Sequence, residues 1–297
     1  MRLDRWLRQR FPDVPLGALS KAVRTGQVRV DGGRAKMETR LTAGQTVRLP
    51  PIAPTGRSAP VASGDAAALD AMTLHRDDHV AVLNKPFGLA VQGGSGVSRH
   101  VDGMLEAWRD RKGRKPRLVH RLDRDTTGVL LVALTRSAAA SLSEAFKGRE
   151  TEKSYLAVTR GHPTPPEGRL ATWLARDPQD GERMAVFPQK TKETQRATTL
   201  YETLDTSGQF ALLALTPVTG RTHQLRVHCT HMGCPILGDP RYFNVQNWDL
   251  PGGLQNRLHL HARRIVIPHP AGGTLDISAP PPPHITQTLN VLGLQGV

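Results

Sequence analysis

Residues 120–134 read HRLDRDTTGVLLVAL, a run of charged side chains that leads directly into an unbroken apolar run. An apolar run of this length next to turn residues is typical of a strand that is buried on both faces. A charged loop in front of such a strand is a common place for active-site groups. Arg121 and Arg124 flank Asp123, and two cations would keep its carboxyl ionised, as a nucleophile or a base requires. A surface cluster of ion pairs has the same composition, so this stretch alone does not decide the function.

Segments with strand and helix patterns surround this stretch. Further strands are predicted at 79–83, 155–159, 211–215 and 264–267, and helices at 137–146 and 225–231. Strands mixed with helices and long loops indicate an α+β or mixed α/β domain, which we place at residues 69–297. The four prolines at 280–283 are expected to end the sheet region before a short terminal helix.

The first 50 residues form a separate basic segment. They carry a net charge of +7, half of the +14 of the whole 297-residue chain. The spacing of apolar residues predicts a helix at 3–11 and a second helix that Pro15 opens and Gly26 ends. Residues 27–30 alternate like a strand and run into Asp31-Gly32, a hairpin turn signal. Residues 1–50 are therefore expected to form a compact basic module, and residues 51–68, rich in Pro, Gly and Ser, a linker.

Composition excludes several classes of protein. Hydrophobic residues make up 38% of the chain, enough for a buried core, yet no apolar run approaches the ~20 residues of a membrane span. The N-terminus lacks the apolar segment of a secretory signal, and two cysteines cannot form a disulfide framework. We therefore expect a cytoplasmic protein that binds no membrane. Its pI of about 10.6 favours a polyanionic partner, most simply a nucleic acid.

Cofactor and metal sites find little support in the sequence. The glycine-rich residues 92–96 lack the lysine of a phosphate-binding loop and the spacing of a dinucleotide site. Four side chains of zinc-ligand type lie close together in the sequence, although their spacing matches no familiar zinc motif. They are His228, Cys229, His231 and Cys234. We favour a helix that packs through Cys229, and we expect no metal and no nucleotide cofactor.

The basic N-terminal segment resembles an S4 RNA-binding domain. The matching stretches are residues 2–7, 20–32 and 41–50, and the turn and hairpin fall where that domain has them. The resemblance implies recognition of structured RNA, with arginines such as Arg5 and Arg24 meeting phosphates. A solvated basic cap is the alternative interpretation.

Six motifs that follow one another across residues 75–285 resemble the RluA-type pseudouridine synthases. They are NKPFG at 84–88, HRLDRDTTG at 120–128, KSY at 153–155, GRTHQLRVH at 220–228, GCPILGD at 233–239 and LHLHA at 258–262. Thr127 stands where the family usually has Ser, and it keeps the hydroxyl. With a leading S4 module, the resemblance is to the subgroup that modifies large-subunit ribosomal RNA. It implies an α+β fold in which a mixed, mainly antiparallel sheet with flanking helices surrounds a central cleft.

The resemblance also implies roles for particular residues. The family's catalytic aspartate corresponds to Asp123, its base-stacking tyrosine to Tyr155, and the arginine that pairs with the aspartate to Arg226. Arg121 corresponds to an arginine that holds the target base out of the RNA stack, and Leu260 to an apolar residue beneath that base. Other residues of these motifs expected to bind substrate are His120, Thr127, Arg221 and His223. Asn84 and Lys85 are interpreted as structural or RNA-facing.

The reaction that the resemblance implies is an isomerisation. It breaks the C1′–N1 bond of a flipped-out uridine, turns the uracil and joins C1′ to C5, so it needs no cofactor. Flipping costs a few kcal/mol, and Tyr155 can stack on the base and handle a proton. Asp123 would either attack covalently or remove a ribose proton, and the sequence leaves both routes open.

Three other functions stay open as alternatives. The chain could be a catalytically silent RNA-binding or ribosome-assembly protein, or it could act on transfer RNA. A hydrolase using Asp123 and His223 is the third, although the sequence has no serine or cysteine nucleophile motif. Pseudouridine formation in ribosomal RNA remains the leading hypothesis, and we expect the protein to be a monomer.

Overall fold

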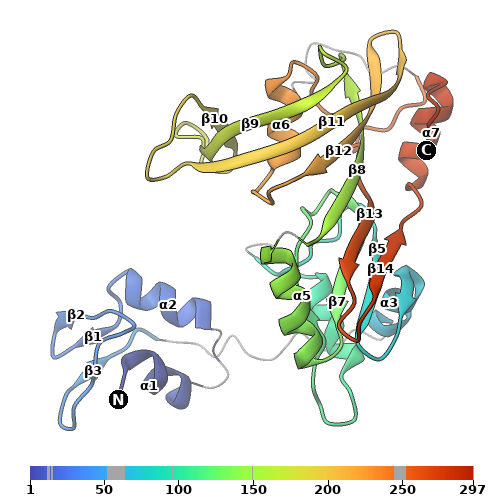
Figure 1. Cartoon of the computed structure of the whole chain (residues 1–297). Coiled ribbons are helices and arrows are strands. Elements are labelled where there is room, and N and C mark those ends of the chain that lie inside the picture. The colour runs from blue at the N-terminus through green and yellow to red at the C-terminus, as the bar shows by residue number, and fades with distance from the viewer. Residues whose placement is uncertain are drawn as a thin grey trace. The chain divides into compact units, whose positions relative to one another are not determined.

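The computed structural model describes residues 1–11, 14, 16–51, 64–94, 97–148, 150–243 and 252–296. The chain divides into two compact units, Met1–Ala62 and Ser63–Val297 (Figure 1). No helix in the described part of the chain is long and apolar enough to cross a membrane.

The smaller unit contains two helices and a three-stranded sheet of order β2-β1-β3. Its elements are α1 (Leu3–Arg10), α2 (Leu16–Arg24), β1 (Arg29–Val30), β2 (Gly33–Arg34) and β3 (Val47–Arg48). Asp31 and Gly32 both have positive φ angles, 47° and 79°, as the two-residue turn of a hairpin requires. The predicted helices and hairpin are present, β3 was not expected, and Pro15 lies outside the described residues.

The larger unit is built on a mixed, mainly antiparallel sheet, in agreement with the expected α+β fold. Its strands are β4 (Thr73–Arg76), β5 (Val80–Lys85), β6 (Arg117–Leu118), β7 (Thr127–Ala133), β8 (Glu152–Arg160), β9 (Glu167–Arg176), β10 (Met184–Phe187), β11 (Gln195–Ser207), β12 (Phe210–Pro217), β13 (Leu260–Pro268) and β14 (Thr274–Ser278). The main order is β10-β9-β11-β12-β8-β13-β7-β5-β4, with β14 beside β13 and β6 beside β7. Among the described strands, only β13 and β7 pair in parallel.

Helices cover both faces of this sheet. They are α3 (Asp65–Met72), α4 (Val101–Met104), the 3-10 helix η1 (Leu105–Trp108), α5 (Arg136–Gly148), α6 (Gln224–His231) and α7 (Pro283–Leu292). Alternate residues of β7 divide between the faces: Leu130 and Val132 pack with α4 and η1, whereas Val129 and Leu131 pack with α5. This two-sided burial explains the unbroken apolar run at 129–134. The start of α3 at Asp65 corrects one expectation, since the linker was predicted to extend to residue 68.

Gly128 fixes the close approach of β7 to β13. Its φ angle is 105°, and a Cβ atom there would lie 2.2 Å from the carbonyl oxygen of Ala262. A side chain at this position would force the two backbones apart and disturb the strand end that follows the 120–126 loop.

Two neutral histidines lie inside the sheet region. His259 bonds the carbonyl of Arg257 and the hydroxyl of Thr288, and His261 bonds Thr127 and the carbonyl of Ala279. Burial is the main cause that lowers the pKa of each histidine from 6.5 to about 4.

These two histidines should make the protein less stable in mild acid. Between pH 6.5 and about 4 the unfolded chain binds more protons at these positions, so stability falls as the pH falls through this window. The urea concentration at the unfolding midpoint should therefore be lower at pH 5 than at pH 7. Equal midpoints at the two pH values would contradict this account.

Candidate active site

The parallel β7–β13 pair brings the predicted site residues together. Asp123 lies in the loop before β7, and Leu260 is the first residue of β13. Tyr155 lies on β8, opposite Ala262 of β13 and Leu215 of β12. Residues far apart in the sequence therefore converge at the middle of the sheet.

A buried arginine links Asp123 to a second aspartate. Arg226, near the start of α6, places Nη1 3.4 Å from Oδ2 of Asp123. Its Nε and Nη2 each donate to Asp239 at 2.7 Å, and the side chain of Asp239 is fully buried. Burial alone would lower the pKa of Arg226, but the hydrogen bonds and the charge of Asp239, together with Asp123, raise it. The guanidinium is therefore held as a fixed cation facing Asp123.

Gly238 positions the carboxylate of Asp239. Its φ angle is 68°, and a Cβ atom would lie 2.0 Å from the carbonyl oxygen of Arg257. Backbone amides of Arg241 and Tyr242 donate to the Oδ1 atom of Asp239 at 2.9 and 3.1 Å. The backbone of a tight turn therefore holds the Asp239 carboxylate in place for its two hydrogen bonds with Arg226.

His223 is a second group that faces Asp123. It has a φ angle of 52° just before α6, and its Nε2 lies 3.8 Å from Oδ2 of Asp123. Its Nδ1 bonds the Tyr242 hydroxyl at 2.8 Å, and that hydroxyl also accepts the backbone N–H of Met184. Burial lowers the pKa of His223, and the charge of Asp123 opposes this change. Tyr242 also lies against the Arg226 guanidinium, so one tyrosine supports both neighbours of Asp123.

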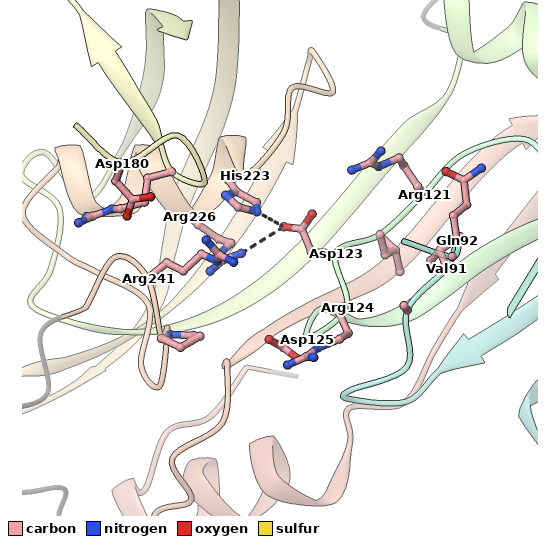
Figure 2. Close-up of a pocket in the computed structure, with 15 residues that line it drawn as sticks. Val91, Gln92, Arg121, Asp123, Arg124, Asp125, Asp180, His223, Arg226 and Arg241 are labelled. Carbon is pink, nitrogen blue, oxygen red and sulfur yellow. Dashed lines mark hydrogen bonds and ion pairs between the residues drawn. The ribbon is translucent and has the colours of Figure 1, made fainter. Parts of the chain in front are cut away.

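Two cavities meet at Asp123. The Tyr155 cavity has a volume of about 470 Å³, and among the residues lining it are Tyr155, Leu260, His120, Phe146 and Arg221. The Arg241 cavity, shown in Figure 2, has a volume of about 910 Å³ and is lined by residues that include Arg124, Asp125, Arg183 and Arg241. The residues that line both cavities are Arg121, Leu122, Asp123, His223 and Arg226. A recess of mixed polar and apolar lining and a mainly polar, arginine-rich recess therefore adjoin one carboxylate.

Tyr155 belongs to the apolar part of the wall of the Tyr155 cavity. Its ring packs against the hydrophobic clusters on both sides of it, which contain Leu122 and Leu260. Burial and the nearby charge of Asp123 raise the pKa of the phenol well above its ordinary value. Tyr155 therefore remains a neutral hydroxyl group that can donate a hydrogen bond.

Lys85 stabilises the loop that contains Asp123 through a hydrogen bond to the backbone of that loop. Its side chain is fully buried, and Nζ donates to the carbonyls of Pro86, Leu89 and Arg124 at 2.8–3.0 Å. Burial lowers its pKa to about 7, against the opposing charges of Asp125 and Asp123. Of the two interpretations offered by the sequence, the structural one holds for Lys85, because no part of this side chain reaches solvent.

Several sequence expectations need correction. Arg124 pairs with Asp125 at 3.2 Å, so this sequence neighbour is not the cation that faces Asp123. Thr127 is buried and bonds Nδ1 of His261, so its hydroxyl stabilises the β7–β13 pair and lines neither cavity. His120 needs no such correction: it lines the Tyr155 cavity, its Nε2 accepts the backbone N–H of Leu131, and its role in substrate binding stays a prediction.

The other expected binding residues divide between the two units. Arg221 lines the Tyr155 cavity, and its Nε donates to the carbonyl of Arg196. Arg5 and Arg24 are exposed on α1 and α2 of the smaller unit. Sequence reasoning assigned no role to Asp239 and did not consider Tyr242, although Asp239 stands in one of the six motifs.

Three of the four side chains of zinc-ligand type, those of His228, Cys229 and Cys234, are buried in the core, whereas His231 is exposed. His228 bonds the hydroxyls of Thr172 and Thr199, and burial lowers its pKa to about 4. Burial raises the pKa of both Cys229 and Cys234, that of Cys234 to about 11. Within the described ranges, no three His, Cys, Asp or Glu side chains are grouped as metal ligands.

Comparisons with known proteins point in one direction. The sequence profile of the RNA pseudouridylate synthases matches residues 79–231. The "Ribosomal large subunit pseudouridine synthase C" of Escherichia coli is 41% identical over 288 residues, which cover 94% of this chain and 89% of that protein. The protein of the same name from Haemophilus influenzae is 39% identical, covering 92% of this chain and 85% of its own length.

A solved human structure has a similar fold. It is named "Human RNA Pseudouridylate Synthase Domain Containing 4" and superposes with a TM-score of 0.66 at 30% identity. The match covers 78% of this chain and 98% of the human one.

Proposed function

This chain belongs to the RNA pseudouridylate synthase family, and on that premise we propose that it converts specific uridines of large-subunit ribosomal RNA to pseudouridine. The observation that carries the proposal is the convergence of Asp123, Arg226 and Tyr155 around one cavity, the Tyr155 cavity. The names of the curated relatives support ribosomal RNA, in preference to transfer RNA, as the substrate. The intact set of charged groups argues against a silent binding protein.

In the proposed mechanism, a flipped uracil enters the Tyr155 cavity. Tyr155 stacks on the base, Leu260 lies beneath it, and Arg121 occupies the space the base leaves in the RNA. Asp123 then acts on the ribose, either at C1′ or on a ribose proton. Both routes need this carboxylate, which Arg226 orients through its bidentate pair with Asp239.

The bond changes balance without any added reagent. The C1′–N1 bond breaks, the uracil turns, C1′ joins C5, the proton on C5 leaves, and N1 gains a proton. Tyr155 lines the cavity that would hold the base, and its hydroxyl can relay a proton there by accepting one as it donates its own. We propose that the reaction uses no cofactor and that the protein acts as a monomer in the cytoplasm.

The experiment that tests the proposed function maps pseudouridine in cells. Large-subunit ribosomal RNA from a strain lacking this chain is treated with a carbodiimide that marks pseudouridine, and reverse-transcription stops are mapped. Defined stops should be missing, and expression of the wild-type chain should restore them. An identical stop pattern with and without the chain would overturn the proposal, and stops changed only in transfer RNA would move the activity to that substrate.

We further propose that residues 1–50 form an S4-type RNA-binding module that supplies affinity and not chemistry. The proposal is supported by the +7 charge of this segment and by the exposure of Arg5 and Arg24 on its two helices. Residues 51–63 would then connect it to the catalytic unit.

The charge-removing variant Arg5→Gln/Arg24→Gln should weaken RNA binding in a salt-dependent way. Each lost phosphate contact lowers the magnitude of the log Kd against log salt slope by about 0.7–0.9. Single-turnover rates at saturating RNA should stay near wild type, because Asp123, Tyr155 and Arg226 belong to the other unit. An unchanged slope would indicate that the segment is only a solvated basic cap.

A further inference from the structure

A second basic recess lies in the larger unit, which we call the distal groove. It has a volume of about 670 Å³ and is lined by residues that include Arg109, Arg114, Lys115, Arg117 and Arg136. Asp123 precedes β7, whereas this groove includes Leu134 to Arg136, which directly follow the same strand. A seven-residue strand spans roughly 20 Å, so the groove is separate from the reaction centre.

Three of these cations have acidic partners that hold them in place. Arg109 pairs with Glu106 at 2.7 Å, Arg114 with Asp110 at 2.6 Å, and Lys115 with Asp102 at 3.0 Å. These pairs order the 102–115 segment that forms one wall of the groove.

The other two cations, Arg117 and Arg136, have no carboxylate partner among the described residues and are exposed. Arg117 lies on β6 and pairs with Ala133 of β7. Arg136, the first residue of α5, follows Ala133 by only three residues. A cation in the first turn of a 13-residue helix opposes the helix dipole, and the first turn of α5 has no acidic residue. This arrangement costs stability in the free protein, and a bound polyanion would offset the cost.

The distal groove is connected to the active site through Gln92. This residue lines both the Arg241 cavity and the distal groove. The Arg241 cavity is itself rich in arginine, with Arg121, Arg124, Arg183 and Arg241 on its walls. Gln92 therefore joins two recesses that each have several arginines in their lining.

We propose that the distal groove binds the phosphate backbone of the RNA that flanks the target uridine, and this inference rests on the proposed function. The flanking strand would leave the Arg241 cavity at Gln92 and place its phosphates against the guanidinium groups of Arg117 and Arg136. Guanidinium groups suit this role because their planar donors match phosphate oxygens. The groove would then set affinity and register for RNA beyond the flipped nucleotide, with no part in the chemical step.

The test compares two double variants of the full chain. Arg117→Gln/Arg136→Gln removes the unpaired cations of the groove, and Lys190→Gln/Lys192→Gln removes two exposed cations from the loop between β10 and β11. Kd for large-subunit ribosomal RNA is measured across a salt series, and circular dichroism verifies that each variant is folded. The groove variant should lose about 1.4–1.8 from the magnitude of the log–log slope, from two contacts at about 0.7–0.9 each. The lysine variant should keep the wild-type slope.

Single-turnover pseudouridine formation in the same samples separates this inference from the proposed function. At saturating RNA the groove variant should react at the wild-type rate. A groove variant with the wild-type slope, or a lysine variant with an equal loss, would overturn the groove assignment. A wild-type chain that binds RNA but makes no pseudouridine would instead overturn the proposed function, while the slopes would still report on the groove.

Discussion

Replacing Asp123 by Asn should abolish pseudouridine formation while leaving folding and RNA affinity near wild type. Asparagine has nearly the same shape and can still accept a hydrogen bond from Arg226, but it lacks the charged oxygen that attacks or removes a proton. We expect the single-turnover rate to fall by on the order of 10³ or more, as when a group that acts in the chemical step is removed. Quantifying pseudouridine in rapidly quenched reactions gives this rate.

Asp125 offers a matched control for this substitution. It lies two residues away, lines the Arg241 cavity and pairs with Arg124 and not with Arg226. Asp125→Asn should keep most of the activity. Wild-type turnover by Asp123→Asn would show that the proposed mechanism is wrong.

Tyr155→Phe should bind RNA almost normally but react far more slowly. The phenyl ring still stacks on the flipped base in the Tyr155 cavity, whereas the neutral hydroxyl that can pass a proton is gone. Loss of a positioned proton-transfer group costs about 10²–10⁴ in rate. Single-turnover rates and Kd, measured together, distinguish this effect from weaker binding, and Tyr155→Leu should lose both functions.

Tyr201→Phe is the matched control, because Tyr201 lies on β11 and lines neither of the cavities at Asp123. It should leave both the rate and the affinity unchanged. If Tyr155→Phe kept the wild-type rate of the chemical step, the role of Tyr155 would be limited to stacking on the base.

The sequence predicts strands best where both faces of a strand are buried. The runs in β7 and β12 are nearly continuous in apolar residues because helices cover each face of the sheet there. In contrast, β11 contains many polar and charged residues and alternates irregularly between buried and exposed positions, so no apolar run marks it. The alanine-rich α3 resembles linker composition, and its burial against the sheet could not be seen locally.

For the candidate site too, the sequence identifies some of the residues and misses others. Motifs and the resemblance identified Asp123, Tyr155 and Arg226, whose side chains line one cavity in the structure. The supporting groups were missed because their roles arise from contacts between distant segments. Asp239 pairs with Arg226 across 13 residues, and the Tyr242 hydroxyl accepts the backbone N–H of Met184 across 58. No local pattern of charge or spacing reports such contacts.

The most direct test of the central claim, that this chain isomerises uridine through Asp123, is the release of tritium from uracil C5. Joining C1′ to C5 expels the hydrogen at that carbon, so large-subunit ribosomal RNA labelled there reports each turnover. Purified wild-type protein in EDTA should release tritium in step with the pseudouridine formed, and Asp123→Asn should release none above background. Release by Asp123→Asn at the wild-type rate, or no release by the wild-type protein from this RNA, would contradict the account.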